Sequence, residues 1–129
     1  MLKSPKKNFL PIPVETERIG KLVLDAAFKV HTTLGPGLLE SVYQVAMKHV
    51  LETEVKLPIM FEGVKLESGL RIDMLVAKCV IAELKSVEKM NPVYEAQLMT
   101  YLRLSGNRLG FLINFNVAHL KDGIKRMVV

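Results

Sequence analysis

The chain has 129 residues, half of them apolar, so it is long enough to bury a core of its own as one domain. Its only cysteine, Cys79, excludes an intramolecular disulfide, and no apolar stretch approaches the ~20 residues that span a bilayer. The net charge of +5 permits binding to a polyanion without requiring it.

The first residues contain lysines and three prolines. Because proline disfavours helix, we expect residues 1–14 to form an extended leader and residues 15–129 to form a single domain. The leader has no uninterrupted apolar region, so we expect no signal peptide and a cytoplasmic location. Apolar residues at a spacing of three and four predict a helix over residues 17–33, capped by Thr16.

A Gly-Pro-Gly run at residues 35–37 ends this helix, and apolar spacing predicts a second helix over residues 38–52. The chain therefore opens with a helical hairpin. Strand character follows over residues 55–61, where Pro58 indicates an edge position. Residues 62–63, Glu-Gly, are predicted to turn the chain.

Two further strands are predicted over residues 71–77 and 79–85, both rich in aliphatic side chains. The second is apolar on both faces, which indicates a central strand covered on both sides. Residues 92–105 form the next predicted helix, because Asn91 can cap a helix that begins with proline and Gly106 can end it.

A strongly apolar strand over residues 109–115 and a weaker one over residues 124–129 complete the chain. The predicted order is α-α-β-β-β-α-β-β. The connection through residues 92–105 is long enough for a right-handed crossover between parallel strands. We therefore expect an α/β fold with a mixed sheet of four or five strands flanked by helices.

Charged residues interrupt the two central apolar runs. Asp73 lies within the first run, while Glu83 and Lys85 close the second. Buried charges are costly unless they are paired or bind a metal. Glu83 and Lys85 share a face of their strand, and Mg²⁺ commonly takes one or two carboxylates, for which Asp73 is the second candidate. Such an ion can activate water and neutralise a phosphodiester, with Lys85 positioning either the water or the phosphate.

This site requires Asp73 and Glu83 to lie on the same face of the sheet. Residues opposite each other in an antiparallel pair share a face, so the opposed positions must sum to an even number. A two-residue turn at residues 77–78 would place Asp73 on the wrong face. We therefore predict a three- or five-residue connection, or a bulge, near residues 77–79, although no glycine is available there for a positive φ.

Three other polar residues accompany this group. Gln97 and Tyr101 are four apart and share a helical face, while Glu40 falls in the first turn of a predicted helix, where an acid suits the dipole. All of these charged and polar residues also have an ordinary interpretation. A Glu-x-Lys pair on a strand is usually solvated, and Gln and Tyr at helical spacing usually lie at the surface and in the core. Taken together, the residues indicate a metal-dependent phosphodiester site.

The segment Gly37-Leu-Leu-Glu-Ser-Val-Tyr43 resembles the motif that names the GxxExxY family, which is grouped with PD-(D/E)XK nucleases. The runs A-E-L-K-S-V, E-A-Q-L-M-T-Y-L-R-L-S-G and L-I-N-F-N-V also resemble this family, and the likeness covers about residues 19–128. It implies a restriction-endonuclease-like core and Mg²⁺- or Mn²⁺-dependent cleavage of nucleic acid, either DNA or RNA.

The resemblance implies six site residues, which are Glu40, Asp73, Glu83, Lys85, Gln97 and Tyr101. Asp73 and Glu83 match the metal-binding carboxylates, with Glu40 as a third candidate ligand. Lys85 matches the motif lysine. Gln97 and Tyr101 resemble the Gln-x-x-x-Tyr element of RecB-type nucleases. Ile72 stands where the motif often has proline.

Two alternatives keep the fold without turnover. One is a regulatory module that binds nucleic acid or a protein, and the other is a structural scaffold without metal affinity. So small a domain leaves little room for substrate recognition, so a homodimer or a partner protein is expected with either a nuclease or a binding module.

Overall fold

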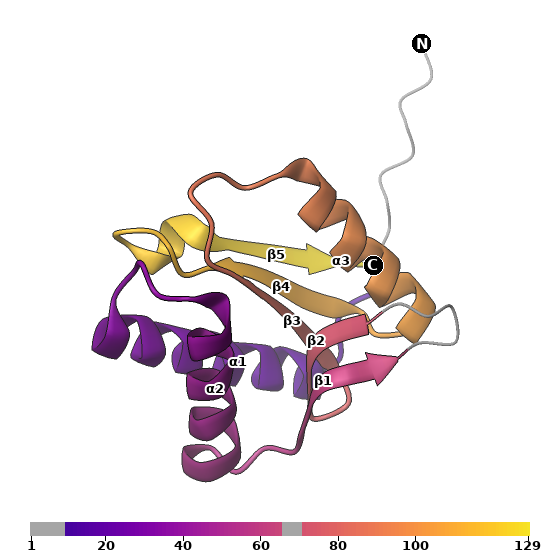
Figure 1. Ribbon diagram of the computed structural model, residues 1–129. Helices are drawn as coiled ribbons and strands as arrows, with labels where there is room; N and C mark the ends of the chain where they lie inside the picture. The colour runs from indigo at the N-terminus through magenta and orange to yellow at the C-terminus, as the bar shows by residue number, and fades with distance from the viewer. Residues whose placement is uncertain (1–9, 66–70) are drawn as a thin grey trace.

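The computed structural model describes residues 10–65 and 71–129, so residues 1–9 of the predicted leader lie outside the described part. Five strands form one sheet in chain order (Figure 1): β1 (Ile59–Lys65), β2 (Arg71–Val76), β3 (Val80–Lys85), β4 (Leu109–Asn114) and β5 (Ile124–Val128). Among the strands that the structure describes, only the β3–β4 pair is parallel, while the other three pairs are antiparallel. The predicted mixed sheet and crossover are confirmed.

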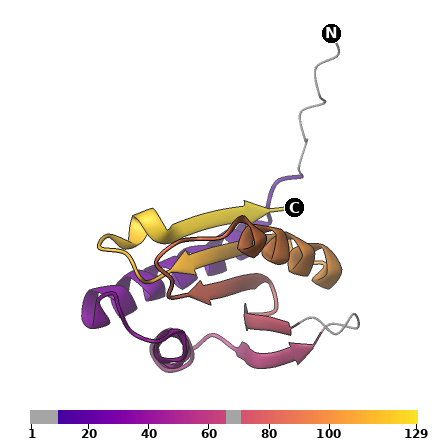
Figure 2. The same cartoon turned by 45° about the horizontal axis from the view of Figure 1, so that its top comes forward.

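Helices cover both faces of the sheet (Figure 2). One face carries α1 (Val14–Leu34) and α2 (Glu40–His49), which continues as a π-helical turn over Val50–Glu54, and the other face carries α3 (Pro92–Ser105). The predicted helix-flanked α/β architecture is confirmed. No helix among the described residues is long and apolar enough to cross a membrane.

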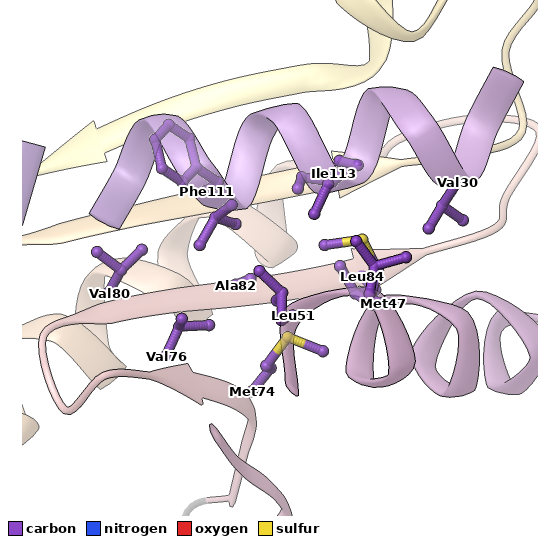
Figure 3. Packing of buried hydrophobic residues seen from close by; sticks show 14 of the residues in the cluster. Val30, Met47, Leu51, Met74, Val76, Val80, Ala82, Leu84, Phe111 and Ile113 are labelled. Atoms are coloured by element: carbon purple, nitrogen blue, oxygen red, sulfur yellow. The ribbon is translucent and has the colours of Figure 1, made fainter. Parts of the chain in front are cut away.

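Strand β3 separates two hydrophobic clusters. Val80, Ala82 and Leu84 face α1 and α2, as Figure 3 shows for the packing around Met47 and Leu51. Ile81 points to the opposite face of the strand and packs against Leu98 and Leu102 of α3. These aliphatic side chains are almost fully buried, which confirms the prediction of a central, two-sided strand. Glu83 and Lys85 therefore lie on the α3 face.

The helical hairpin forms with different boundaries. Helix α1 begins at Val14, directly after Pro13, so Thr16 lies inside the helix and the predicted cap is wrong. The fixed φ of proline suits a helix start, and Pro13 O accepts the first helical bond, from Glu17 N–H. Helix α2 begins at Glu40 rather than at residue 38, because the backbone of Leu39 is extended.

The first strand was predicted too early. Lys56 has a φ of 62° and Pro58 lacks an N–H, so β1 begins only at Ile59, although it is an edge strand as expected. Residues 62–63 do not turn the chain either. They lie inside β1, where the register with β2 shifts between Phe61 and Val64. This irregularity lies opposite Asp73, and bulges of this kind bend a strand and redirect its side chains.

Helix α3 has the predicted bounds. Asn91 Oδ1 accepts a hydrogen bond from Val93 N–H at 2.9 Å, Pro92 opens the helix, and Gly106 closes it in the left-handed region with a φ of 75°. A short 3-10 turn over Leu120–Gly123, before β5, was not anticipated. The crossover thus places the start of α3 above the end of β3, where Lys85 lies.

Candidate active site

The connection between β2 and β3 sets which face Asp73 occupies. Three residues, 77–79, separate the strands, and the ladder pairs Met74 with Ala82 and Val76 with Val80. Each pair sums to an even number, so Asp73 comes opposite Glu83 on the same face, and the prediction for this connection is confirmed. Ala77 and Lys78 adopt the left-handed region themselves, with φ of 50° and 60°, in the place of glycine.

Side chains replace the backbone ladder where Asp73 meets Glu83. The β2–β3 pairing ends at Met74 and Ala82. At the next position the N–H of Asp73 donates to Oε1 of Glu83, and the N–H of Leu84 donates to Oδ2 of Asp73, both at 3.2 Å. Each carboxylate is therefore held by one oxygen. The two carboxyl groups also contact each other directly, side chain to side chain, so a ligand that enters between them would meet both.

Burial and negative charge act on the same carboxylates. Glu83 is only 7% exposed, and its burial, together with the charge of Asp73, raises its pKa to about 8. Burial and then Asp73 also raise the pKa of Glu40, while Lys85 acts in the opposite direction on both glutamates. Three acids thus share one nearby ammonium. With a pKa of about 8, Glu83 holds a proton near neutral pH, and a bound cation would take the place of that proton.

The three acids come from both layers of the fold. Asp73 and Glu83 project from neighbouring strands, whereas Glu40 is the first residue of α2 on the opposite face of the sheet. Helix α2 approaches β3, and Glu40 lies close enough to Asp73 and Lys85 for their charges to act on its pKa. Where the β2–β3 pairing ends, residues from the strands and from α2 therefore lie close together.

Lys85 is oriented by an aromatic ring that sequence reasoning did not identify. Its Nζ lies 4.2 Å from the ring centroid of Tyr94, in the first turn of α3. A cation over an aromatic face is attracted by the ring quadrupole. The available signal was spacing, because Tyr94 precedes Tyr101 by seven residues and therefore shares its helical face.

Helix α3 contributes one of its two predicted residues. Tyr101 is half-buried, and its pKa is raised first by burial and then by the charges of Glu83 and Asp73, which places its hydroxyl near the acidic pair. Gln97 is exposed, and among the described residues it makes no hydrogen bond to the site. The structure therefore brings together Glu40, Asp73, Glu83, Lys85 and Tyr101, but leaves Gln97 at the surface.

The donor set fits a hard cation with few protein ligands. Among the described residues, no three acidic, histidine or cysteine side chains have the spacing of a metal cluster. The two facing carboxylates of Asp73 and Glu83 remain as candidate ligands. Mg²⁺ is usually bound through one or two carboxylates and keeps several waters, so Asp73 and Glu83 suit it without a third ligand.

A separate hollow of about 680 Å³ lies between α1 and α2. Its lining is mainly aliphatic, and its acid, Glu54, is paired with Lys29. It contains none of the five clustered residues, so its size does not make it the reactive centre. The charged cluster instead combines acids, an ammonium and a phenol.

Comparison with known proteins adds one finding. Residues 17–127 match the PD-(D/E)XK nuclease superfamily. The matched stretch covers most of the chain and includes every clustered residue. No curated protein and no solved structure matches the chain. The two carboxylates and the lysine lie on adjacent strands, as I-D in β2 and E-L-K in β3. The protein belongs to the PD-(D/E)XK nuclease superfamily.

Proposed function

We propose that the protein is a metal-dependent nuclease that hydrolyses phosphodiester bonds in nucleic acid. Asp73 and Glu83 would hold Mg²⁺ or Mn²⁺, and Lys85 would act beside them. The observation that carries this proposal is the replacement of the β-ladder by two facing carboxylates from neighbouring strands. A purely structural sheet has no need to interrupt its pairing with buried acids.

Bound at this position, the ion would supply charge neutralisation for the phosphate and a more acidic water. The protein's own groups would supply the geometry. The backbone N–H groups of Asp73 and Leu84 hold the carboxylates in place. The Tyr94 ring keeps the ammonium of Lys85 on the same side, where it can position the attacking water or a phosphate oxygen.

The remaining residues line the approach to this centre. Glu40 would hold a water at its outer side, and the hydroxyl of Tyr101 would contact the substrate or the leaving oxygen. Gln97 lies one turn before Tyr101 on the exposed surface of α3, where it is accessible to a bound strand. We therefore assign it to substrate binding rather than to the reacting atoms.

The finer assignments are part of the same proposal. The G-L-L-E-S-V-Y run over residues 37–43 supports placing the chain in the GxxExxY group of the superfamily. The net charge of +5 suits a polyanionic substrate, DNA or RNA. We propose a cytoplasmic protein with residues 15–129 as its domain, assisted by a second copy or a partner protein in substrate recognition.

Cleavage assays test the function directly. Purified protein is incubated with single-stranded, duplex and branched DNA and RNA, with Mg²⁺ or Mn²⁺. We expect cleavage that falls by ~100-fold or more in Glu83→Gln and in Lys85→Ala, as is typical when a charge-stabilising group is removed. Glu17→Gln is the matched control, because Glu17 is an exposed acid paired with Arg126. Absence of cleavage from every substrate with both ions contradicts the proposal.

A second candidate is a binding module that has the same fold but no turnover. The observation in its favour is that the described residues contain no three-ligand metal cluster. It predicts binding of nucleic acid that weakens steeply as salt rises and is unchanged in Glu83→Gln. The nuclease instead predicts that this variant loses cleavage while it still binds substrate.

A further inference from the structure

We propose that Tyr43 and Ser86 are positioning residues whose hydroxyl groups together fix Glu40 beside Asp73 and Lys85. Their shared target is the loop over residues 35–39, which joins α1 to α2 and leads directly into Glu40. The inference rests on the proposed function, because it assigns these hydroxyls to the geometry of that site. It goes beyond the family match, which identifies no role for either residue.

Tyr43 fastens the loop from the side of α2. Its side chain is fully buried, and its ring stacks on Phe115 at a centroid distance of 4.5 Å and an interplanar angle of 7°. With the ring held in this way, its hydroxyl donates to the carbonyl of Gly35 at 2.6 Å and accepts from the N–H of Leu38 at 3.2 Å. One hydroxyl thus bridges both ends of the loop.

Ser86 fastens the same loop from the side of the sheet. Its hydroxyl donates to the carbonyl of Leu38 at 2.5 Å, so both backbone groups of Leu38 are held by side chains. Ser86 directly follows Lys85, whose carbonyl accepts from the N–H of Phe115 at 2.9 Å. The loop is therefore tied to the residue that comes next after the site lysine.

The backbone on the other side of Ser86 is also held. Asn114, at the end of β4, is buried, and its side chain accepts from the N–H of Val87 at 3.1 Å and donates to the Val87 carbonyl at 3.0 Å. Ser86 thus lies between two fixed residues, Lys85 and Val87. It is a rigid point of attachment rather than a loose surface hydroxyl.

The loop has little else to hold it. Gly35 and Gly37 both have positive φ, at 71° and 93°, and glycine loses the most conformational freedom on ordering. The N-cap of α2 is Leu39, which offers no side-chain hydrogen bond, so local capping does not fix where the helix begins. Leu38 and Leu39 are exposed and do not anchor the loop in the core. The two hydroxyls supply the restraint that packing and capping leave out.

Kinetics separates positioning from simple stability. Tyr43→Phe and Ser86→Ala each remove one hydroxyl. Ser105→Ala is the matched control, because the Ser105 hydroxyl makes similar bonds to backbone groups at the C-terminal end of α3. We expect kcat to fall roughly 10-fold in the first two variants with KM little changed, and no change in the control. In a Glu40→Gln background the same substitutions should add less than about twofold, because their effect passes through Glu40. Full additivity overturns the proposal.

The hydroxyl groups of Tyr43 and Ser86 together form a latch on the loop over residues 35–39. Amide hydrogen exchange tests this latch without reference to activity. In the metal-free protein we expect exchange of the Leu38 amide to accelerate roughly fivefold in Tyr43→Phe, as loss of one hydrogen bond predicts. Ser86→Ala should accelerate exchange of the Val42 amide, which donates to the carbonyl of Leu39 at 3.0 Å, because the start of α2 is released. Unchanged exchange in both variants overturns the latch even if the wild type cleaves. If the wild type cleaves no substrate but exchange rises as expected, the proposed function fails and the latch stands.

Discussion

The two ends of the β2–β3 strand pair differ in how their backbone groups are hydrogen-bonded. At the turn, three ladder pairs bring together aliphatic side chains that the helices bury, and the sheet is continuous. At the other end the ladder stops, and Asp73 and Glu83 take the hydrogen bonds that backbone groups would otherwise make. The first end contributes stability. The carboxylate end lowers the stability of the fold, because it places two acidic groups side by side where little water reaches them.

The largest expected effect tests whether the end of the pair that carries Asp73 and Glu83 contributes to function but not to stability. Glu83→Gln should reduce cleavage by ~100-fold or more. At pH 8 without metal it should raise the melting temperature, because an amide keeps the hydrogen bond from Asp73 N–H without adding charge. Cleavage assays and thermal unfolding of the same samples measure both. A variant that loses stability together with activity contradicts the contrast between the two ends.

The next effect concerns the turn end. Ile81 is fully buried against α3, so Ile81→Ala should lower the free energy of unfolding by ~2–5 kcal/mol through lost burial and a residual cavity. The smaller change Ile81→Val should cost ~0.5–1.5 kcal/mol. Denaturant unfolding gives both values. Cleavage per folded molecule should stay within about twofold, and a larger loss would show that the two ends are not separable.

The third effect depends on pH. The folded pKa of Glu83, about 8, lies above its ordinary value of 4.5. Its neutral form therefore favours the folded chain fully below pH 4.5, and that contribution is lost as the pH rises through 8. Thermal unfolding of metal-free protein should show stability falling between these values, by ~1.4 kcal/mol for each unit of pKa difference. Glu83→Gln should flatten the profile, and an equally steep profile in that variant contradicts the assignment.

The smallest effect concerns the turn itself. Lys78 is exposed with a φ of 60°, a region that costs a side-chain-bearing residue ~1–2 kcal/mol. Glycine removes that strain but adds ~0.5–1 kcal/mol of chain entropy. Lys78→Gly should therefore stabilise the protein by ~1 kcal/mol at most and leave cleavage unchanged. Equilibrium denaturation resolves such a shift, and a clear destabilisation would contradict the description of the turn.

Local chemistry made some elements predictable. The bounds of α3 follow from Asn91, Pro92 and Gly106, which act within a few residues of the helix ends. Parity predicted a connection of three or five residues, or a bulge, because the face of Asp73 depends only on counting, and the structure has three residues there. Strand β1 was harder to predict. The neighbours of the left-handed Lys56 bond back to the π-helical turn, and the irregularity opposite Asp73 depends on pairing between strands.

The site was predictable where its residues interrupt apolar runs and not where they act through distant contacts. Asp73, Glu83 and Lys85 stand out because charge in such runs is unusual. Tyr94 and Ser86 carry no such signal, because one acts through a ring face and the other through a carbonyl 48 positions away. Gln97 was grouped with Tyr101 by spacing, but its side chain lies on the solvent side.

Calorimetric titration with Mn²⁺ tests the central claim, that Asp73 and Glu83 form one cation site. The wild type should bind one ion, with proton release near pH 7 because Glu83 must ionise to act as a ligand. Asp73→Asn and Glu83→Gln should each abolish this binding, while Glu17→Gln should leave it intact. Binding of equal strength in all four proteins, or none in the wild type, would contradict the account.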